Sequence, residues 1–228
     1  MRVAIVGGTG DEGFGLAVRL AGSGLDVTIG SRVQDRAEDA ALRARALAGD
    51  DAPVDGRENP KAVAAADVVF VTVPYEGQAA TYRALKEHWP PGIVVCDTTT
   101  PLATAVGGRP TQVIRPWHGS AAEQARAHLP DGVGLVAGFH SVGAEPLTNH
   151  PHPVDADALL CGDDDDAKAE IGALAERIPG MRWVDCGPLS MARVLEPITA
   201  VLISVNRRYR IKDGGVRFSG RDAWGRPS

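Results

Sequence analysis

Three glycines near the start of the chain are spaced as in sites that bind a dinucleotide. Gly8, Gly10 and Gly13 directly follow a short hydrophobic run, residues 3–6, and read as G-x-G-x-x-G; counted from Gly7, the segment reads G-x-x-G-x-x-G. In either register the turn leaves backbone N–H groups uncovered at the start of a helix, where a pyrophosphate can approach closely. Because the motif follows a strand and opens a helix, it predicts dinucleotide binding rather than a tight structural turn.

The residues that end the second predicted strand favour NADP over NAD. An acidic residue here would hold the ribose hydroxyls of NAD, but the chain reads TIGSR, residues 28–32. Ser31 can donate a hydrogen bond, Arg32 can bind a phosphate through two N–H groups, and Arg36 lies one helical turn further on the same side. These side chains are predicted to bind the 2′-phosphate of NADP. The alternative is that both arginines are solvated charges that pair with the nearby acids Asp35, Glu38 and Asp39.

Residues at the ends of later predicted strands are expected to face the same crevice. In open α/β sheets, ligands bind beyond the carboxyl ends of the strands. Val73 and Pro74 follow one strand and are predicted to flank a nicotinamide ring. Two further strand ends carry polar residues, at 98–100 and 140–142. Together these segments predict a polar-rimmed slot next to the glycine turn.

Such a site needs a sheet that is covered by helices on both faces. Short apolar runs predict seven strands, at residues 2–6, 26–29, 68–73, 93–96, 133–139, 158–161 and 182–184. Stretches with helical apolar spacing lie between most of them, at residues 15–21, 36–47, 78–89, 121–129 and 167–178, and the first helix is expected to begin near Phe14. This alternation predicts an α/β fold of the Rossmann type with a doubly wound, mainly parallel sheet. A chain of 228 residues can form one large core, with or without a small lobe.

Several helix starts have a physical signature in the sequence. Asn59-Pro60 predicts an N-cap followed by proline at the first helical position, and Ser120 with Glu123 has capping-box spacing. The run of four acids at residues 163–166 is expected to cap the helix that begins near residue 167. A site for a hard cation is the less favoured alternative, because adjacent side chains point in different directions.

The C-terminal third departs from the alternation of strand and helix. Residues 141–155 contain three prolines and are expected to form a polar loop. A long apolar helix is predicted at residues 189–207, with a kink at Pro197. Its wide apolar face predicts a homodimer contact, with burial inside the same chain as the alternative. The tail, residues 219–228, is expected to be flexible.

Composition excludes several classes of protein. The formal net charge is −5 and no segment concentrates lysine and arginine, so a nucleic-acid partner is not expected. The three cysteines have no Cys-x-x-Cys spacing, which favours a reducing cytoplasm over a disulfide framework. No signal segment precedes the first predicted strand and no apolar run approaches the roughly 20 residues of a membrane helix, so a soluble cytoplasmic protein is expected. His150 and His152 lack further ligands, so no metal site is predicted.

Several segments together resemble the NADPH-dependent reductases of the deazaflavin coenzyme F420. They are MRVAIVGGTGDEG at the start, GSR after the second strand, VTVPYE, GFHSVGA, and CGDDDDAK followed by VDCGPLSMARVLEPITAVLISVN. The resemblance covers about residues 1–218, with the segments in the family's order. It implies a Rossmann domain that binds NADP, residues 1–145. It also implies a smaller C-terminal lobe of helical or αβ structure, residues 146–228, that closes the deazaflavin pocket and contributes to a dimer contact.

The resemblance also implies roles for individual residues. NADP contacts are implied at Thr9, Gly10, Asp11 and Glu12, together with the 2′-phosphate group Ser31, Arg32 and Arg36 and a nicotinamide floor around Val73 and Pro74. The space where both rings meet would be bordered by His140, Ser141 and Ala144, and its deazaflavin end would be closed by Gly214, Gly215 and Val216. The chain departs from the family at Tyr75 and Gly143, where tryptophan and proline are usual, and these positions are on the side of the second substrate.

The implied activity is hydride transfer between NADP(H) and coenzyme F420 by direct ring-to-ring contact. The two coenzymes supply the electronic chemistry and the protein holds them in position. No catalytic residue is therefore obligatory. His140 is the one candidate, because it could orient the acceptor or relay a proton; the alternative is a structural, hydrogen-bonded histidine. Two other functions stay open: an NADPH-dependent reductase of another acceptor (a flavin, imine or ketone), and a non-catalytic module that senses NADP.

Overall fold

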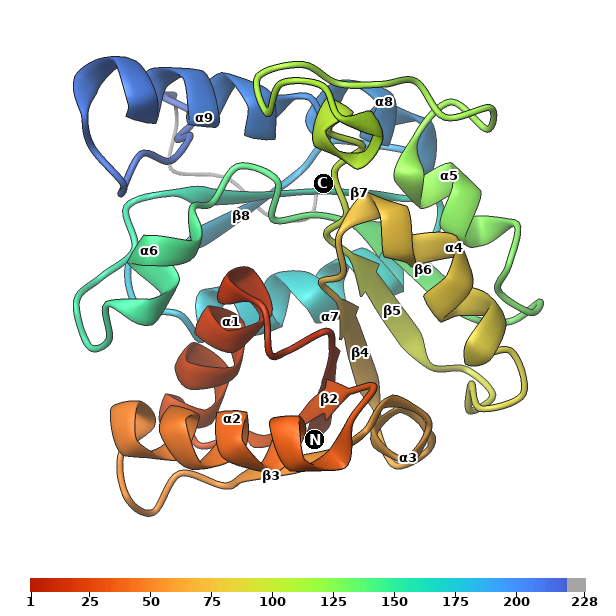
Figure 1. Ribbon diagram of the computed structural model, residues 1–228, viewed down its shortest axis with the longest axis vertical. Helices are drawn as coiled ribbons and strands as arrows, with labels where there is room; N and C mark the ends of the chain where they lie inside the picture. Colours follow the sequence, from red (N-terminus) through yellow and green to blue (C-terminus); the bar gives the residue numbers. More distant parts are fainter. Residues whose placement is uncertain (221–228) are drawn as a thin grey trace.

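The chain folds around one eight-stranded sheet. The structure is a computed structural model that describes residues 1–220, so most of the tail predicted to be flexible lies outside the described residues. The strand order is β3-β2-β1-β4-β5-β6-β7-β8 (Figure 1). The bounds are β1 Arg2–Val6, β2 Asp26–Ser31, β3 Val54–Glu58, β4 Val68–Val71, β5 Val94–Asp97, β6 Gly134–Ala137, β7 Asp157–Gly162 and β8 Arg182–Asp185. The Rossmann-type, doubly wound α/β fold is confirmed.

The parallel strands end at one level. Val6 of β1 is paired with Gly30 of β2 and Val71 of β4, and the row continues through Asp97 of β5 to Ala137 of β6. The carboxyl ends of five strands therefore form one continuous edge, at which the loops that follow them meet. Strand β7 runs antiparallel to β6, whereas β8 is parallel to β7. Apolar periodicity carries no information on strand direction, so this antiparallel junction was not predicted.

Helices cover both faces of the sheet. Their bounds are α1 Asp11–Gly22, α2 Gln34–Ala48, α3 Asn59–Ala64, α4 Tyr75–Ala84, α5 Ala121–Arg126, α6 Ala144–Thr148, α7 Asp165–Glu176, α8 Ala192–Leu195 and α9 Ile198–Tyr209, with 3-10 turns at Ala103–Val106 and Leu189–Met191. One core contains residues of α1, α2 and α7, and a second core contains residues of α3, α4, α5 and α8.

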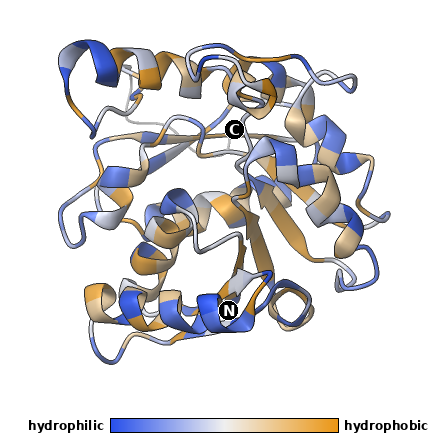
Figure 2. Cartoon of the chain, in the orientation of Figure 1, coloured by the Kyte–Doolittle hydropathy of each residue, from blue (hydrophilic) through white to orange (hydrophobic). Residues whose placement is uncertain are grey.

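The strands are apolar on both sides because each face packs against helices. In β1, Val3 and Ile5 belong to the first core, and Ala4 and Val6 belong to the second. All four side chains are buried, and full burial of a side chain such as Ile5 contributes roughly 1.5–3 kcal/mol to folding. Figure 2 shows the same pattern as hydrophobic central strands under helices whose outer faces are hydrophilic.

The seven predicted strands are all present, but β3 was missed. Its sequence is VDGRE, in which only Val54 is strongly apolar. Gly56 is needed in this strand because a Cβ there would lie 2.4 Å from the backbone of Ala37 in α2. The strand is therefore specified by close packing against α2, which leaves no hydrophobic pattern in the sequence.

Several predicted boundaries shift. Helix α1 begins at Asp11 rather than near Phe14, and α4 begins at Tyr75 because Pro74 is its N-cap. The Ser120 hydroxyl accepts a hydrogen bond from the Glu123 N–H at 3.0 Å, which confirms this cap, whereas Glu58 and not Asn59 precedes α3. The predicted polar loop at residues 141–155 contains the short helix α6.

The acidic run before α7 caps that helix, as predicted. The Asp164 carboxylate accepts hydrogen bonds from the Asp166 and Ala167 N–H groups at 2.9 and 3.0 Å. Asp163 accepts one from the Leu189 N–H, and Asp165 pairs with Lys168. The described residues contain no group of three or more His, Cys, Asp or Glu residues arranged to hold a metal ion.

The last helix is interrupted at Pro197, as predicted. Helix α8 ends at Leu195 and α9 begins at Ile198, with Pro197 as its N-cap. Within the described residues, the segment Leu189–Tyr209 is long and apolar enough to cross a membrane by length and composition. The expectation that no stretch approaches this length was therefore wrong. The same segment contains the buried Glu196.

Candidate functional site

The glycine turn lies between the end of β1 and the start of α1 and is packed tightly against β4. Gly7 has φ = 81°, in the left-handed region that favours glycine, and a Cβ there would lie 2.8 Å from the Val73 Cγ1. A Cβ at Gly13 would lie 2.3 Å from the Thr72 Oγ1. These glycines are required because the turn touches the residues that follow β4.

The outer side of the turn is open, as a bound phosphate requires. No side chain caps α1 at its N-cap residue Gly10, and a Cβ there would meet only the Gly7 carbonyl oxygen, at 3.5 Å. Thr9 and Asp11 are exposed, while Gly8 is buried and donates its N–H to the Ile5 and Gly30 carbonyl groups. The first N–H groups of a helix have no intrahelical partners. This cradle therefore fits a pyrophosphate at the positive end of α1.

Glu12 is the unexpected residue of this cradle. Its half-buried side chain reaches from α1 to the end of β5, where it hydrogen-bonds to the Thr98 side chain close to Asp97. Burial, opposed by the bond to Thr98, raises the pKa of Glu12 to about 8. At neutral pH the carboxyl group is mostly protonated. The acids at residues 11 and 12 thus add less negative charge to the cradle than the sequence suggests.

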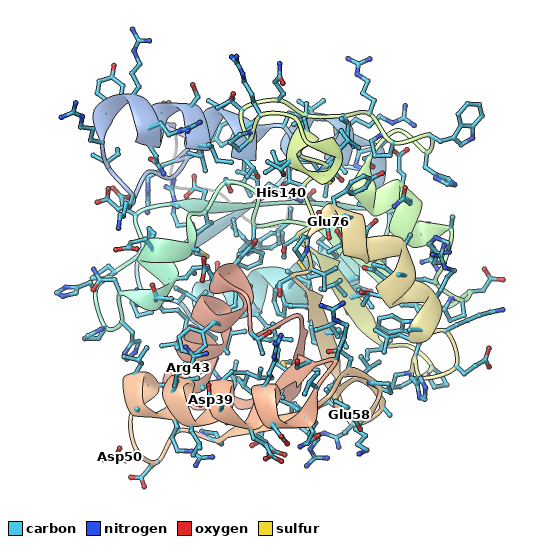
Figure 3. The ribbon with its side chains drawn as sticks, in the orientation of Figure 1. Asp39, Arg43, Asp50, Glu58, Glu76 and His140 are labelled. Atoms are coloured by element: carbon cyan, nitrogen blue, oxygen red, sulfur yellow. The ribbon has the colours of Figure 1, made fainter. Side chains whose placement is uncertain are left out.

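The three residues predicted to bind the 2′-phosphate lie together after β2. Ser31 ends the strand and is buried, Arg32 follows it and is exposed, and Arg36 is exposed in the first turn of α2. Two of the nearby acids have other partners, since Asp39 pairs with Arg43 and Glu38 accepts a hydrogen bond from Gln34. Within residues 1–220, neither Arg32 nor Arg36 forms a salt bridge. Figure 3 shows Asp39 and Arg43 on α2.

The residues predicted to flank the nicotinamide connect the glycine turn to β5. Val73 is half-buried and Pro74 is exposed at the start of α4. The Thr72 hydroxyl donates to the Val6 carbonyl at 3.1 Å, and the Thr99 hydroxyl donates to the Val73 carbonyl at 3.3 Å. The ends of β1, β4 and β5 are therefore tied together side by side, which forms the floor of the predicted slot.

Asp97 is a buried carboxylate that the sequence analysis did not single out. It accepts hydrogen bonds from Gln78 at 3.0 Å, from the Tyr82 hydroxyl at 2.7 Å and from the Thr99 N–H at 2.9 Å. Burial raises its pKa and these donors oppose the shift. Its position at the carboxyl end of a predicted strand was a usable signal. Asp97 holds the turn that carries Thr98 and Thr99.

Glu196 is a second buried acid on the same side of the sheet. Its carboxylate accepts hydrogen bonds from the Ala121 and Ala122 N–H groups, both at 2.9 Å, and so caps α5. Burial raises its pKa to about 8, and the two N–H donors oppose the shift. This contact fixes the break between α8 and α9 to α5. An acid within an apolar helix was the one sequence signal for this contact.

His140 lies buried between the strand ends and α9 (Figure 3). No hydrogen bond of acceptable geometry reaches either ring nitrogen, Nδ1 or Nε2, within the described residues. Burial lowers its pKa to about 4, and the neighbouring Thr99 backbone opposes this shift. The ring is therefore neutral near pH 7 and is free to donate one hydrogen bond and to accept another.

The backbone of His140 is held by α9. The Thr199 hydroxyl donates to the His140 carbonyl at 3.0 Å and also contacts the Thr100 hydroxyl at 2.9 Å. Thr199 was missed because it lies in an apolar helix with no local motif. The contact brings β5, β6 and α9 together at one point.

The remaining predicted residues gather beside His140. Ser141 is fully buried, and its hydroxyl donates to the Asp157 carbonyl at 2.7 Å. Gly143 precedes Ala144, the first residue of α6, and a Cβ on Gly143 would lie 3.4 Å from the Gly214 carbonyl oxygen. The Val216 N–H donates to the Ser141 carbonyl at 3.1 Å. The structure thus brings the C-terminal segment to the loop after β6, and it commits the Ser141 hydroxyl to the backbone.

Other features lie away from this edge. Two surface depressions, bordered by residues that include Arg2, Asp26 and Glu170, contain none of the predicted site residues and lie where β1 and β2 begin. Trp117 is 97% exposed and therefore does not pack in the loop that carries it. The carboxyl edge of the sheet is the candidate site.

Comparisons with known proteins agree with this geometry. Residues 2–101 match the family model described as NADP oxidoreductase, coenzyme F420-dependent. The F420-dependent NADP reductase of Methanothermobacter thermautotrophicus is 40% identical over 221 residues, which cover 96% of this chain and 95% of that protein. The protein of the same name from Methanocaldococcus jannaschii is 41% identical over 222 residues, 96% of this chain and 98% of that protein.

A solved structure shows the same fold. A putative F420-dependent NADP reductase from Arthrobacter sp. FB24 aligns with a TM-score of 0.79 over 96% of this chain and all of that chain. Its sequence identity is 23%, so this likeness concerns the fold.

Proposed function

This chain belongs to the F420-dependent NADP reductase family, and from that premise we propose that it transfers a hydride between NADP(H) and the deazaflavin coenzyme F420. The observation that carries the proposal is that one edge of the sheet holds two half-sites, one for the nucleotide and one for the acceptor. An open glycine cradle lies at β1 and β2, with two arginines that form no salt bridge within residues 1–220. A buried loop that carries the neutral His140 follows β6 on the same edge, beyond β4 and β5.

The nucleotide half would hold NADP(H) through contacts of three kinds. Backbone N–H groups around Gly10 would bind the pyrophosphate, Arg32 and Arg36 would bind the 2′-phosphate with Ser31, and Val73 and Pro74 would flank the nicotinamide. The freedom of both guanidinium groups from salt bridges within residues 1–220 supports this assignment. Charge-assisted bonds to a 2′-phosphate select NADP over NAD.

The acceptor half would hold the deazaflavin against the nicotinamide. The coenzymes supply the hydride chemistry, and the chain contributes position and the exclusion of water. His140, Ser141, Ala144 and Gly214 would border this space. The neutral His140 ring could hydrogen-bond to the acceptor, but an imidazolium that donates its proton is disfavoured near pH 7 because its pKa is about 4.

The N-terminal and C-terminal parts of the chain would have different roles in binding. Residues 1–145 would bind NADP, and residues 146–228 would close the deazaflavin pocket; the hydrogen bond between Val216 and Ser141 supports this role for the second part. The three cysteines are free thiols, which fits a reducing compartment, and we place the enzyme in the cytoplasm.

We further propose a homodimer formed through α8 and α9. Val194, Val201 and Val205 are 59%, 58% and 38% exposed along the outer side of these helices. Apolar side chains at such spacing form a stripe that a second copy could cover. Light scattering at micromolar concentration should give twice the chain mass, and a mass of one chain would contradict the dimer.

Mixing NADPH with oxidised F420 without oxygen tests the proposed activity. The visible absorbance of the deazaflavin should disappear rapidly with NADPH. The matched reactions, NADH with F420 and NADPH with FMN, should be slow. If NADPH binds while F420 stays oxidised, the acceptor is wrong, and another acceptor or a sensor of NADP becomes the better account.

A further inference from the structure

One face of helix α1 is shaped to receive the segment that follows the acceptor loop. Gly15, Arg19 and Gly22 are four and three residues apart and so lie on one side of the helix. A Cβ at Gly15 would lie 2.5 Å from the Leu147 Cβ, and a Cβ at Gly22 would lie 2.8 Å from the His150 Nε2. Because both glycines lack a side chain, α6 and the residues after it lie directly on α1 (Figure 1).

Arg19 is a buried charge at the centre of this face. Its side chain is 1% exposed. The guanidinium Nε donates to the Leu147 carbonyl at 2.8 Å, and Nη2 donates to the Pro146 and Asn149 carbonyls at 2.5 and 3.0 Å. Burial lowers the pKa of Arg19, but a guanidinium remains charged in proteins.

The backbone carbonyls that accept hydrogen bonds from Arg19 explain why a buried arginine occupies this position. The last carbonyl groups of a helix have no intrahelical partners and carry partial negative charge. Helix α6 has five residues, so most of its carbonyls need outside donors. Within the described chain no carboxylate forms a salt bridge with Arg19, and these carbonyls are its counter-charge. The Nη1 atom is buried and has no hydrogen-bond partner among residues 1–220.

The held segment continues directly from the acceptor loop. Three other hydrogen bonds hold that loop, and all join it to the C-terminal part: Thr199 donates to the His140 carbonyl, Val216 donates to the Ser141 carbonyl, and the Ser141 hydroxyl donates to the Asp157 carbonyl. Arg19 instead comes from the helix whose first turn forms the phosphate cradle. From Asp11 to Arg19 the helix rises about 12 Å, at 1.5 Å per residue.

We propose that Arg19 is a positioning residue that ties the acceptor loop to the nucleotide-binding helix. Through this tie α1 sets the distance between the two half-sites, so that the reacting rings meet in the geometry for transfer. The inference deepens the proposed function and rests on it. A misplacement of about 1 Å can slow a reaction roughly 100-fold without abolishing binding.

Replacing Arg19 by methionine tests the tie. Arg19→Met keeps much of the volume but removes every donor to the α6 carbonyls. Hydride transfer in a single turnover should fall roughly 100-fold and the KM for F420 should rise, while the Kd for NADPH should change less than about twofold. Arg19→Lys restores a charged donor and should recover part of the loss. Gly15→Ala, which pushes Leu147 away with Arg19 intact, should act in the same direction and serves if Arg19→Met does not fold.

A second variant, destabilised outside the site, distinguishes a positioning role of Arg19 from a general loss of stability. Ile171→Ala removes a fully buried side chain of α7, outside the site, and should lower the melting temperature. Its hydride transfer should stay near the wild-type rate at a temperature where it is folded. The proposal is overturned if Arg19→Met behaves like Ile171→Ala, or if it loses NADPH binding in parallel with transfer.

Hydrogen exchange measures whether Arg19 holds residues 144–150 in place, and the measurement needs no acceptor. In Arg19→Met, backbone amides of residues 144–150 should exchange at least roughly tenfold faster than in the wild type, while those of β1 should not change. Equal exchange at residues 144–150 would overturn the tie whatever the acceptor is. If wild-type protein does not reduce F420, the proposed function fails, and exchange still decides on the role of Arg19.

Discussion

Gly13 of α1 and Thr72, the residue directly after β4, approach so closely that a Cβ on Gly13 would lie 2.3 Å from the Thr72 Oγ1. The same Cβ would lie 2.9 Å from the Gly8 Cα. The third glycine of the motif is therefore a packing requirement that brings the phosphate cradle next to the floor of the slot.

Gly13→Ala should weaken NADPH binding and lower the free energy of unfolding by about 1–3 kcal/mol, because the methyl group forces α1 away from β4. Calorimetry and thermal unfolding measure the two effects. Thr72→Ala removes one of the colliding atoms, so the double variant should be less destabilised than the sum of the single variants. Strict additivity would show that the two residues do not collide.

Arg32→Ala and Arg36→Ala should each weaken NADPH binding by about 1.5–3 kcal/mol and leave NADH binding nearly unchanged. The reason is the loss of a charge-assisted bond to the 2′-phosphate. Arg43→Ala is the matched control on α2, because Arg43 pairs with Asp39 and its guanidinium lies over the Phe14 ring. Equal losses for NADPH and NADH would contradict the assignment.

Glu12 should make NADPH binding depend on pH. Because its pKa is raised to about 8, ionisation above pH 8 places a negative charge beside the pyrophosphate and should weaken binding. Glu12→Gln should abolish this fall in a titration from pH 6 to 9, whereas Asp11→Asn, at an exposed position, should keep it. The raised pKa also means that the folded state binds the extra proton between about pH 4.5 and 8, so stability falls as pH rises through this range. An unchanged pH profile in Glu12→Gln would show that another group titrates.

His140 should make the fold sensitive to acid. Its pKa is lowered from 6.5 to about 4, so the unfolded chain takes up the proton first as the pH falls. Stability should therefore drop by about 3 kcal/mol between pH 6.5 and 4, at 1.36 kcal/mol per pKa unit. Chemical denaturation at several pH values should show a smaller drop for His140→Gln. The same variant should slow F420 reduction while NADPH binding is kept; unchanged turnover would end the role of His140 at the acceptor.

The sequence was informative where function depends on local spacing. Three features depend on residues that are adjacent in the sequence, and the structure has each of them in the predicted place. They are the glycine turn, the TIGSR strand end and the break at Pro197. The seven apolar runs predicted seven of the eight strands because strands buried on both faces are continuously hydrophobic.

The rest depends on contacts between distant segments. Strand β3 depends on the close approach of Gly56 to α2. The antiparallel direction of β7 is defined by its pairing with β6. Arg19 and Thr199 act on backbone carbonyls 128 and 59 residues away in the chain, and such contacts leave no local motif. The burial that shifts the pKa of Glu12 and His140 is likewise a tertiary property. A charged residue at position 19, within an otherwise apolar helical stretch, was the one available signal for that contact.

Direct transfer between the two rings is best tested with NADPH that carries deuterium at both C4 positions. After reaction with oxidised F420 in ordinary water, mass spectrometry of the reduced deazaflavin should find one deuterium, at C5. The reverse labelling, unlabelled NADPH in deuterated water, should leave that position unlabelled. Deuterium lost to the solvent in the first reaction, or gained from it in the second, would contradict the face-to-face arrangement of the two half-sites.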